Sequence, residues 1–357
     1  MEQEIYHDSD TWLEEKGPRQ NVVVSSRARL ARNLSRIPFA THANKEELSK
    51  VSQLVDRTIK KRPNLKLFQP IILREVSSRA RRYLKESHII SPEMEKGTNY
   101  RLVYLSPDFH ISIMVNEEDH LRIQGLVAGF QLKKILDKIF SIEEDLTDSM
   151  NVAFSEQFGY LTACPTNLGT GLRISVMLHL PGLVMTRNID DTLKMLQPHG
   201  LTFRGFYGEN SEFSGDLYQV SNEISLGKTE EEIVWLLTKV VETVIEREEE
   251  ARNNLFTSQV KIVEDTIWRS YGLLTQARTI DTQEAMKLLS RIRLGIDKGY
   301  FKTIDHYRLN RLIIEIQPAH LEHENTLQSN SEARDSARAE LLRNLFNPLQ
   351  AEPGNEN

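Results

Sequence analysis

Residues 111–124 read ISIMVNEEDHLRIQ, a predicted strand that runs directly into three consecutive carboxylates. Ile111, Ile113 and Val115 alternate with other residues, which is the period of a half-buried strand. Similar strand character occurs at 102–104, 174–180, 201–209 and 217–226. Because neighbouring strands such as the last two have no helix between them, we expect an antiparallel sheet with helices packed on it.

Helical patterns lie on both sides of these strands. The segment 45–90 has helical spacing of apolar residues, and Thr229 with Glu232 forms a capping box ahead of an apolar stripe at 233–244. Beyond this stripe the chain reads as helices joined by short turns, with a polar break at 320–333. The sequence therefore predicts an α+β fold. Its expected parts are an antiparallel-sheet domain over 1–250, an all-helical domain over 251–346 and a flexible tail over 347–357.

Length and charge limit the kind of protein. The 357 residues suffice for about two domains with a sizeable core. The chain has 45 Lys and Arg against 51 Asp and Glu, a net charge of −6, so no global positive field favours nucleic acid. A single cysteine, Cys164, excludes an internal disulfide and a multi-cysteine metal site, and we expect no protein-held metal. Without an apolar signal segment or a membrane span, the chain is expected to be cytoplasmic and not bound to membranes.

Three segments match known nucleotide-binding or metal-binding motifs only in part and do not predict a binding site. LGKT (226–229) resembles the end of a phosphate-binding P-loop, but Asn222 replaces the required glycine. GTGLRI (169–174) lacks the last glycine or alanine of a dinucleotide fingerprint. His320 and His323 lie in the polar break without the Glu-x-x-His pattern of a metal pair. Any nucleotide must therefore be held by other means.

Five arginines lie in or beside the predicted strands and their turns: Arg27, Arg29, Arg122, Arg173 and Arg204. Taken alone, each of these arginines is most simply interpreted as a solvated side chain at the end of a strand. Five in this setting suit the oxygens of a triphosphate, because a guanidinium donates paired hydrogen bonds to phosphate. Phosphoryl transfer then needs little beyond Mg²⁺ and alignment.

Carboxylates accompany these arginines. On a regular strand Glu117 and Glu118 point to opposite faces, so we expect only one of them in a site, with Glu117 or Asp119 serving Mg²⁺ or the structure. A separate carboxylate, Glu209, ends the segment RGFYGE (204–209). Two separated carboxylates suit a guanidinium substrate, which must be held and must lose a proton as its nitrogen attacks. The alternative interpretation of the acidic run is a solvated turn.

Four segments together resemble the phosphagen kinases, which phosphorylate guanidino nitrogens with ATP. They are SSRARLARN (25–33), NEEDHLRIQ (116–124), TACPTNLGTGLR (162–173) and RGFYGE (204–209). Metabolic members of that family have a helical domain ahead of the first segment and end soon after the catalytic domain. Here only residues 1–24 precede Ser25, and about a hundred helical residues follow the sheet domain. In both respects the chain resembles the bacterial protein-arginine kinases, with further matches at HIISPE (88–93), RSYGLL (269–274) and RDSARA (334–339).

This resemblance implies roles for individual residues. Glu118 is the expected catalytic base, Glu209 the second carboxylate that holds the guanidinium, and Asp119 a support for the loop. Cys164 is expected to position the substrate, although a small buried apolar residue is the simpler interpretation. The expected cofactors are ATP and Mg²⁺. The expected ATP contacts are Ser25, Ser26, Arg27, Ala28, Arg29, His88, Arg122, Arg173, Ile174, Ser175, Val176, Met177, Arg204, Gly205, Phe206, Tyr207, Gly208 and Glu209.

The RDSARA segment has two interpretations. On the residues alone, Arg334 and Arg338 lie four apart on a short, solvated helix, with Asp335 available for an internal ion pair. The resemblance implies instead an allosteric site that binds phosphoarginine. Its expected residues are Arg334, Asp335, Ser336, Ala337, Arg338 and Ala339.

The resemblance also implies a biological setting. The expected activity is phosphorylation of arginine in protein substrates, which marks them for Clp-type proteolysis. The expected partners are an activator protein, a stress-response repressor, a Clp-type AAA+ chaperone and a second copy of the chain in a homodimer. Two alternatives remain: a metabolic kinase of a free guanidino compound, and a non-catalytic adaptor that binds phosphoarginine proteins. The short segment before Ser25 disfavours the first, and the retained Glu118 disfavours the second.

Overall fold

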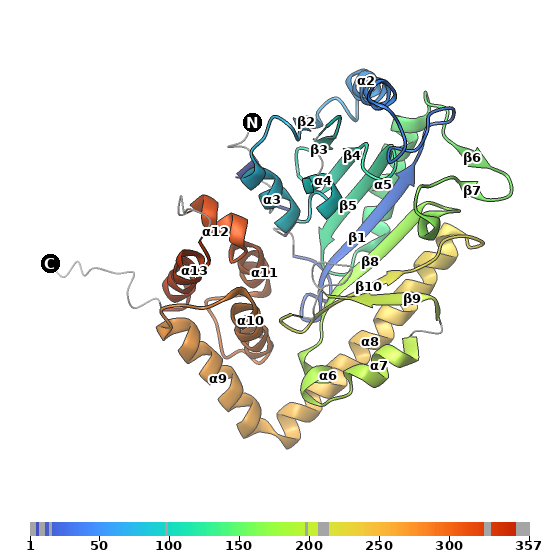
Figure 1. Cartoon of the computed structure of the whole chain (residues 1–357). Helices are drawn as coiled ribbons and strands as arrows, with labels where there is room; N and C mark the ends of the chain where they lie inside the picture. The colour runs from blue at the N-terminus through green and yellow to red at the C-terminus, as the bar shows by residue number, and fades with distance from the viewer. Residues whose placement is uncertain are drawn as a thin grey trace.

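An eight-stranded antiparallel sheet forms the centre of the computed structural model, which describes residues 5–6, 11–13, 16–96, 99–196, 199–205, 214–324 and 330–347 (Figure 1). The strands lie in the order β2-β3-β4-β5-β1-β8-β10-β9. Their bounds are β1 (Val23–Arg32), β2 (Gln69–Ile72), β3 (Leu102–Leu105), β4 (Ile111–Val115), β5 (Leu121–Ala128), β8 (Leu172–His179), β9 (Leu201–Arg204) and β10 (Leu217–Asn222). Every pairing in this sheet is antiparallel, which confirms the predicted sheet. A separate hairpin joins β6 (Phe154–Ser155) to β7 (Gly159–Tyr160).

Neighbouring residues of the strands enter two different cores. Val176 and Val127 pack with helices α2 (Lys45–Lys61), α5 (Leu132–Thr147) and α8 (Glu230–Ser258), which cover one face of the sheet. Met177 and Leu126 belong to a second core on the other face, with residues of α3 (Ser78–Glu86), α4 (Pro92–Lys96) and the C-terminal helices. This division follows from the alternation of side chains along a strand. The short helices α6 (Pro181–Met185) and α7 (Ile189–Leu196) follow β8.

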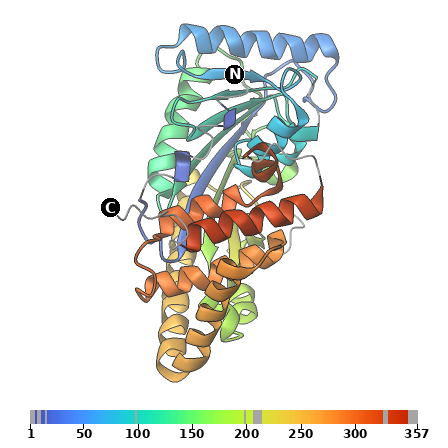
Figure 2. The same cartoon turned by 90° about the vertical axis from the view of Figure 1, so that its left-hand side faces the viewer.

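The long helix α8 begins at the predicted capping box. The Thr229 hydroxyl accepts from the Glu232 amide (3.2 Å), and the Glu232 carboxylate accepts from the Thr229 amide (2.9 Å). The domain boundary expected at 250 falls inside this helix, which runs to Ser258 before the chain turns back. The helices that follow are α9 (Val260–Gln276), α10 (Thr282–Asp297), α11 (His306–Glu315), α12 (Pro318–Glu324) and α13 (Ser331–Phe346). Figure 2 views the molecule from their side and shows these orange and red helices in front of the strands.

Two segments differ from the predicted elements. The stretch 45–90 is not continuously helical, because α2 ends before Pro63 and β2 then pairs with β3. Part of the predicted polar break, 320–324, belongs to α12, where the His320 ring is buried and stacks on Tyr83 of α3 with centroids 3.6 Å apart. Tertiary packing thus gives these polar residues partners. The predicted tail lies outside the described residues apart from Asn347, and no helix in the described ranges is long and apolar enough to cross a membrane.

Candidate active site

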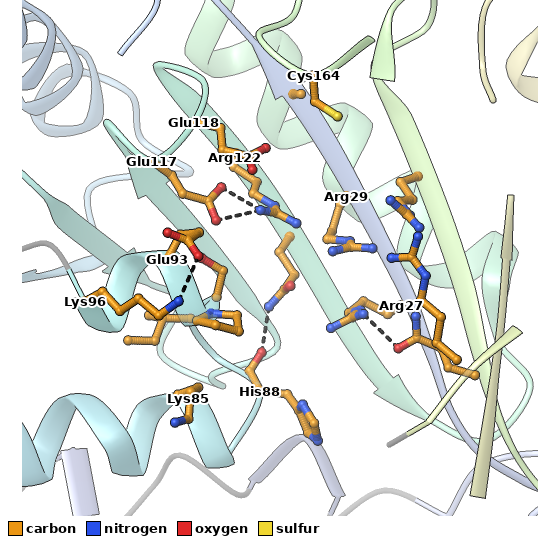
Figure 3. Close-up of a pocket in the computed structure, with 18 of the residues that line it drawn as sticks. Arg27, Arg29, Lys85, His88, Glu93, Lys96, Glu117, Glu118, Arg122 and Cys164 are labelled. Carbon is orange, nitrogen blue, oxygen red and sulfur yellow. Dashed lines mark hydrogen bonds and ion pairs between the residues drawn. The ribbon is translucent and has the colours of Figure 1, made fainter. Parts of the chain in front are cut away.

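The five predicted arginines line one cavity of about 940 Å³ on the face of the sheet opposite α5 and α8 (Figure 3). Arg27 and Arg29 lie two apart on β1 and therefore on the same face. The register places Arg29 opposite Arg173 of β8, while Arg122 lies on β5, the neighbour of β1 on its other side. Arg204 ends β9. Antiparallel pairing thus gathers residues that are far apart in the sequence.

These guanidinium groups repel one another. Burial and the neighbouring Arg122, Arg173 and Arg204 lower the pKa of Arg27 to about 9. Burial and the same kind of repulsion hold the pKa of Arg29 well below its ordinary value, and its Nε is buried without a hydrogen-bond partner in the described part of the chain. A polyanion bound here would relieve the repulsion between the arginines and accept hydrogen bonds from their guanidinium groups.

The acidic loop 116–120 is a turn rather than a continuation of the strand. Asn116 has a left-handed backbone (φ 60°), and its amide donates to the carbonyl of His120 (3.0 Å). The Asn116 side chain holds the turn by donating to the carbonyls of Tyr100 (2.9 Å) and Leu48 (3.0 Å). As a result both Glu117 and Glu118 line the cavity, and the expectation that only one of them could do so is wrong.

Glu117 is committed to an arginine. Both of its carboxylate oxygens accept from Nη1 of Arg122 at 2.6 Å, and the side chain is buried. Burial opposes ionisation of both partners, but their mutual attraction outweighs it. The attraction lowers the pKa of Glu117 and raises the pKa of Arg122. Glu117 therefore fixes one of the cavity's positive charges in place.

Glu118 and Asp119 have different surroundings. Glu118 is half-buried and makes no hydrogen bond or ion pair within the described ranges, and burial followed by repulsion from Glu117 raises its pKa. Asp119 is buried and accepts from Nδ2 of Asn33 (2.5 Å) and from the amide of Ala163 (2.7 Å). Glu118 is thus the carboxylate available to a ligand. Asp119 ties its loop to the end of β1 and to the segment that carries Cys164.

Sequence reasoning missed Asn33. Its Oδ1 accepts from the amide of His120 (2.8 Å), and its Nδ2 also donates to the carbonyl of Leu161 (3.1 Å). A buried asparagine at the end of a strand is the only local signal, and it does not indicate a distant partner. Cys164 lines the cavity as expected, with its Sγ 3.0 Å from Oγ1 of Thr166.

The remaining predicted ATP contacts divide by the alternation of the strands. Ser25, His88, Ser175 and Met177 line a small recess that shares Arg27, His88 and Gln219 with the cavity. In contrast, the side chains of Ser26, Ala28, Ile174 and Val176 line neither the cavity nor the recess. Ala28, Ile174 and Val176 pack in the core of the opposite face, and the Ser26 hydroxyl donates to the carbonyl of Gly129. Gly205 follows Arg204, while Phe206, Tyr207, Gly208 and Glu209 lie outside the described residues.

The RDSARA residues lie on α13 and do not line this cavity. Arg334 donates to Glu322 of α12 (2.9 Å), a buried carboxylate that also accepts from Arg82 of α3 (2.7 Å). Asp335 forms the predicted internal ion pair with Arg338 (2.6 Å). Arg338 is not solvated: it is buried and donates to the carbonyls of Ile316, just after α11, and Ile280, just before α10. Ala337 and Ala339 are also buried, whereas Ser336 is exposed.

The cavity does not offer a protein cage for a metal ion. In the ranges described, no three His, Cys, Asp or Glu side chains come together as ligands, and Glu117 and Asp119 already bind protein donors. This arrangement fits Mg²⁺ that arrives with phosphate oxygens and keeps its water, which is how Mg²⁺ commonly binds in phosphotransferases.

Comparison with known proteins gives two family matches. The ATP:guanido phosphotransferase C-terminal catalytic domain matches residues 50–251, and the protein-arginine kinase McsB C-terminal domain matches residues 260–357. The protein-arginine kinase of Desulforamulus reducens is 44% identical over 99% of both chains. That of Bacillus mycoides is 42% identical over 93% of this chain and 94% of the relative.

Solved structures give the same fold. A taurocyamine kinase from Schistosoma mansoni, a duplicated chain with bound transition-state analogue components, has a TM-score of 0.60 at 26% identity. The match covers 67% of this chain and 35% of that one. A lombricine kinase has a TM-score of 0.58 at 24% identity over 65% of this chain and 68% of its own, a likeness of fold alone.

Proposed function

The chain belongs to the ATP:guanido phosphotransferases and is a protein-arginine kinase, and we propose that the cavity described above is where the γ-phosphoryl group of ATP passes to an arginine side chain. One observation carries this proposal. Five arginines line the same cavity as Glu118, a half-buried carboxylate that has no hydrogen-bond or ion-pair partner among the described residues. The arginines suit a triphosphate and the carboxylate suits a guanidinium.

In the proposed reaction, Glu118 is the catalytic base. A guanidinium nitrogen of the substrate attacks the γ-phosphorus, the new N–P bond forms as the bond to the β-phosphate oxygen breaks, and Glu118 takes the displaced proton. The arginines hold the charge that develops on the transferring group, and Glu117 keeps Arg122 aimed at it. Mg²⁺ bound with the phosphates supplies further charge neutralisation. We assign Asp119 to positioning of the loop, Cys164 to positioning of the substrate and Glu209 to the second guanidinium contact.

The decisive variant is Glu118→Gln, which keeps the shape of the side chain and removes its basicity. We expect transfer to a protein substrate to fall by about 10²–10⁴-fold, the usual contribution of a general base, while the Kd for ATP stays within about twofold. Phosphoryl transfer is followed by ADP release and ATP affinity by titration. Glu144→Gln, on an exposed position of α5, is the matched control and should behave as wild type. Full turnover by Glu118→Gln would remove Glu118 from the role of base.

We also propose a regulatory and cellular setting, on the strength of the family resemblance. Arg334 and Asp335, with their RDSARA neighbours, would bind phosphoarginine and increase activity. The enzyme would act in the cytoplasm as a homodimer, with an activator protein. It would mark its substrates for Clp-type proteolysis and modify a stress-response repressor.

A further inference from the structure

The cavity has two chemically different ends. Figure 3 shows Glu118 and Cys164 at one end and Lys85 and His88 at the other, with Arg122, Arg29 and Arg27 between them. A triphosphate that spans these arginines with its γ-phosphate toward Glu118 therefore places the nucleoside toward His88.

The His88 end has the character of a nucleoside site. Next to Arg27 it opens into a small recess with apolar walls from Trp12, Leu126 and Met177. Trp12 is held there, because its indole nitrogen donates to the carbonyl of Ser87 (3.1 Å) and its ring meets His88 edge-on. A flat heteroaromatic base over this recess would bury apolar surface, while the ribose and the base edge would face the main cavity.

The helical domain lines the same cavity with Thr282, Gln283, Gln317 and Pro318. Gln317 and Pro318 lead into α12, which meets the sheet domain at the end of α3, only two positions before His88. There Glu86, itself a lining residue, accepts from the amide of Ala319 (2.9 Å) and from Nδ1 of His320 (3.1 Å). The helical domain is therefore joined to the wall of the cavity at its nucleoside end.

The position of α10 is fixed by a second set of contacts. Met286 lies one turn beyond Thr282 on the same helix face, and its carbonyl packs so closely on Gly215 that a Cβ there would come within 2.7 Å of it. One turn further, Ser290 and Arg291 bind Asp216, the arginine at 2.6 Å. Gly215 and Asp216 lead into β10, whose Gln219 lines the cavity and accepts from Arg27 (2.9 Å). These contacts fix α10 against the segment that leads into β10, and the first turn of α10 lines the same cavity as Gln219.

We propose that Thr282 and Gln283 bind the nucleoside part of ATP, so that the helical domain completes the nucleotide site. The inference rests on the proposed function and goes beyond it by adding residues outside the catalytic domain. A threonine hydroxyl and a glutamine amide can each donate and accept, which suits ribose hydroxyls and the edge of a base. Neither side chain adds charge, so they would contribute affinity for the nucleoside without affecting the phosphates.

The test compares ATP with inorganic tripolyphosphate, which has the phosphates but no nucleoside. In the full chain carrying Thr282→Ala and Gln283→Ala, we expect the Kd for ATP to rise about tenfold, the effect of losing one or two hydrogen bonds. The Kd for tripolyphosphate should stay within about twofold of wild type. Gln283→Ala alone should give a smaller change in the same direction. Glu284→Ala, an exposed neighbour that does not line the cavity, is the matched control and should leave both affinities unchanged.

Two results would overturn the inference. One is an unchanged ATP affinity in the double variant, and the other is an equal loss of affinity for ATP and tripolyphosphate, which would indicate a general distortion of the cavity. Both presuppose that the wild-type chain binds ATP. Failure of the wild type to bind ATP would contradict the proposed function itself, so the two failures are distinguishable.

Discussion

At the scale of single residues, three consecutive carboxylates have three different surroundings. Glu117 meets a guanidinium, Asp119 meets an amide and an asparagine, and Glu118 meets neither in the described part of the chain. The turn at Asn116 creates this division. Sequence reasoning identified the acidic run and the arginines, but strand alternation alone gave the wrong orientation for Glu117, because alternation does not apply inside a turn.

The raised pKa of Glu118 predicts how activity depends on pH. A base must be ionised to act, and a raised pKa means that Glu118 loses its charge at a higher pH than an ordinary glutamate, whose pKa is about 4.3. The acid side of the kcat/KM profile should therefore fall at a pH above that value. The rate is measured as ADP release, because the N–P bond of the product is acid-labile. Unfolding measured at each pH separates titration from denaturation, and constant activity of the folded protein down to an ordinary glutamate pKa would contradict this assignment.

At the scale of elements, the prediction succeeded where one local pattern determines the structure. Alternation located β4 and β8, and the capping box located the start of α8. The prediction failed where tertiary contacts determine which element forms. The strand β2 exists because β3 offers it an edge, and α12 forms in a polar segment because His320 and Glu322 are satisfied by α3. No periodic pattern of residues within these segments predicts such tertiary contacts.

The helices α12, α13 and α3 meet at Glu322, which predicts the behaviour of two variants. Arg334→Ala removes one guanidinium partner of Glu322, and Arg82 still neutralises the carboxylate. Basal activity should therefore persist. If Arg334 and Asp335 bind phosphoarginine, then Arg334→Ala and Asp335→Ala should each lose the stimulation of kinase activity by added phosphoarginine.

The control for this prediction is Glu340→Gln, an exposed position on the same helix, which should keep both basal activity and stimulation. Because Asp335 also pairs with buried Arg338, the Tm of Asp335→Ala is measured alongside. Unchanged stimulation in both variants would argue against a phosphoarginine site at α13.

At the scale of the whole molecule, the sheet domain and the helical domain share one cavity. The part of the cavity formed by the sheet domain could be predicted from the sequence, because its arginines and carboxylates lie in short segments that resemble family motifs. The proposed contribution of Thr282 and Gln283 could not, since tertiary packing, such as that of α10 on Gly215 and Asp216, brings them to the cavity. Glu118 lies at the far end of this cavity from Lys85 and His88 (Figure 3).

The most direct test of the account is phosphate transfer from Mg²⁺-ATP to an unfolded, arginine-containing protein and, in parallel, to free arginine. Products are analysed at neutral pH to preserve the N–P bond. We expect phosphate on the arginine side chains of the protein, and about 10²–10⁴-fold slower formation of this product with Glu118→Gln. Phosphate on free arginine alone, or on neither acceptor, would contradict it.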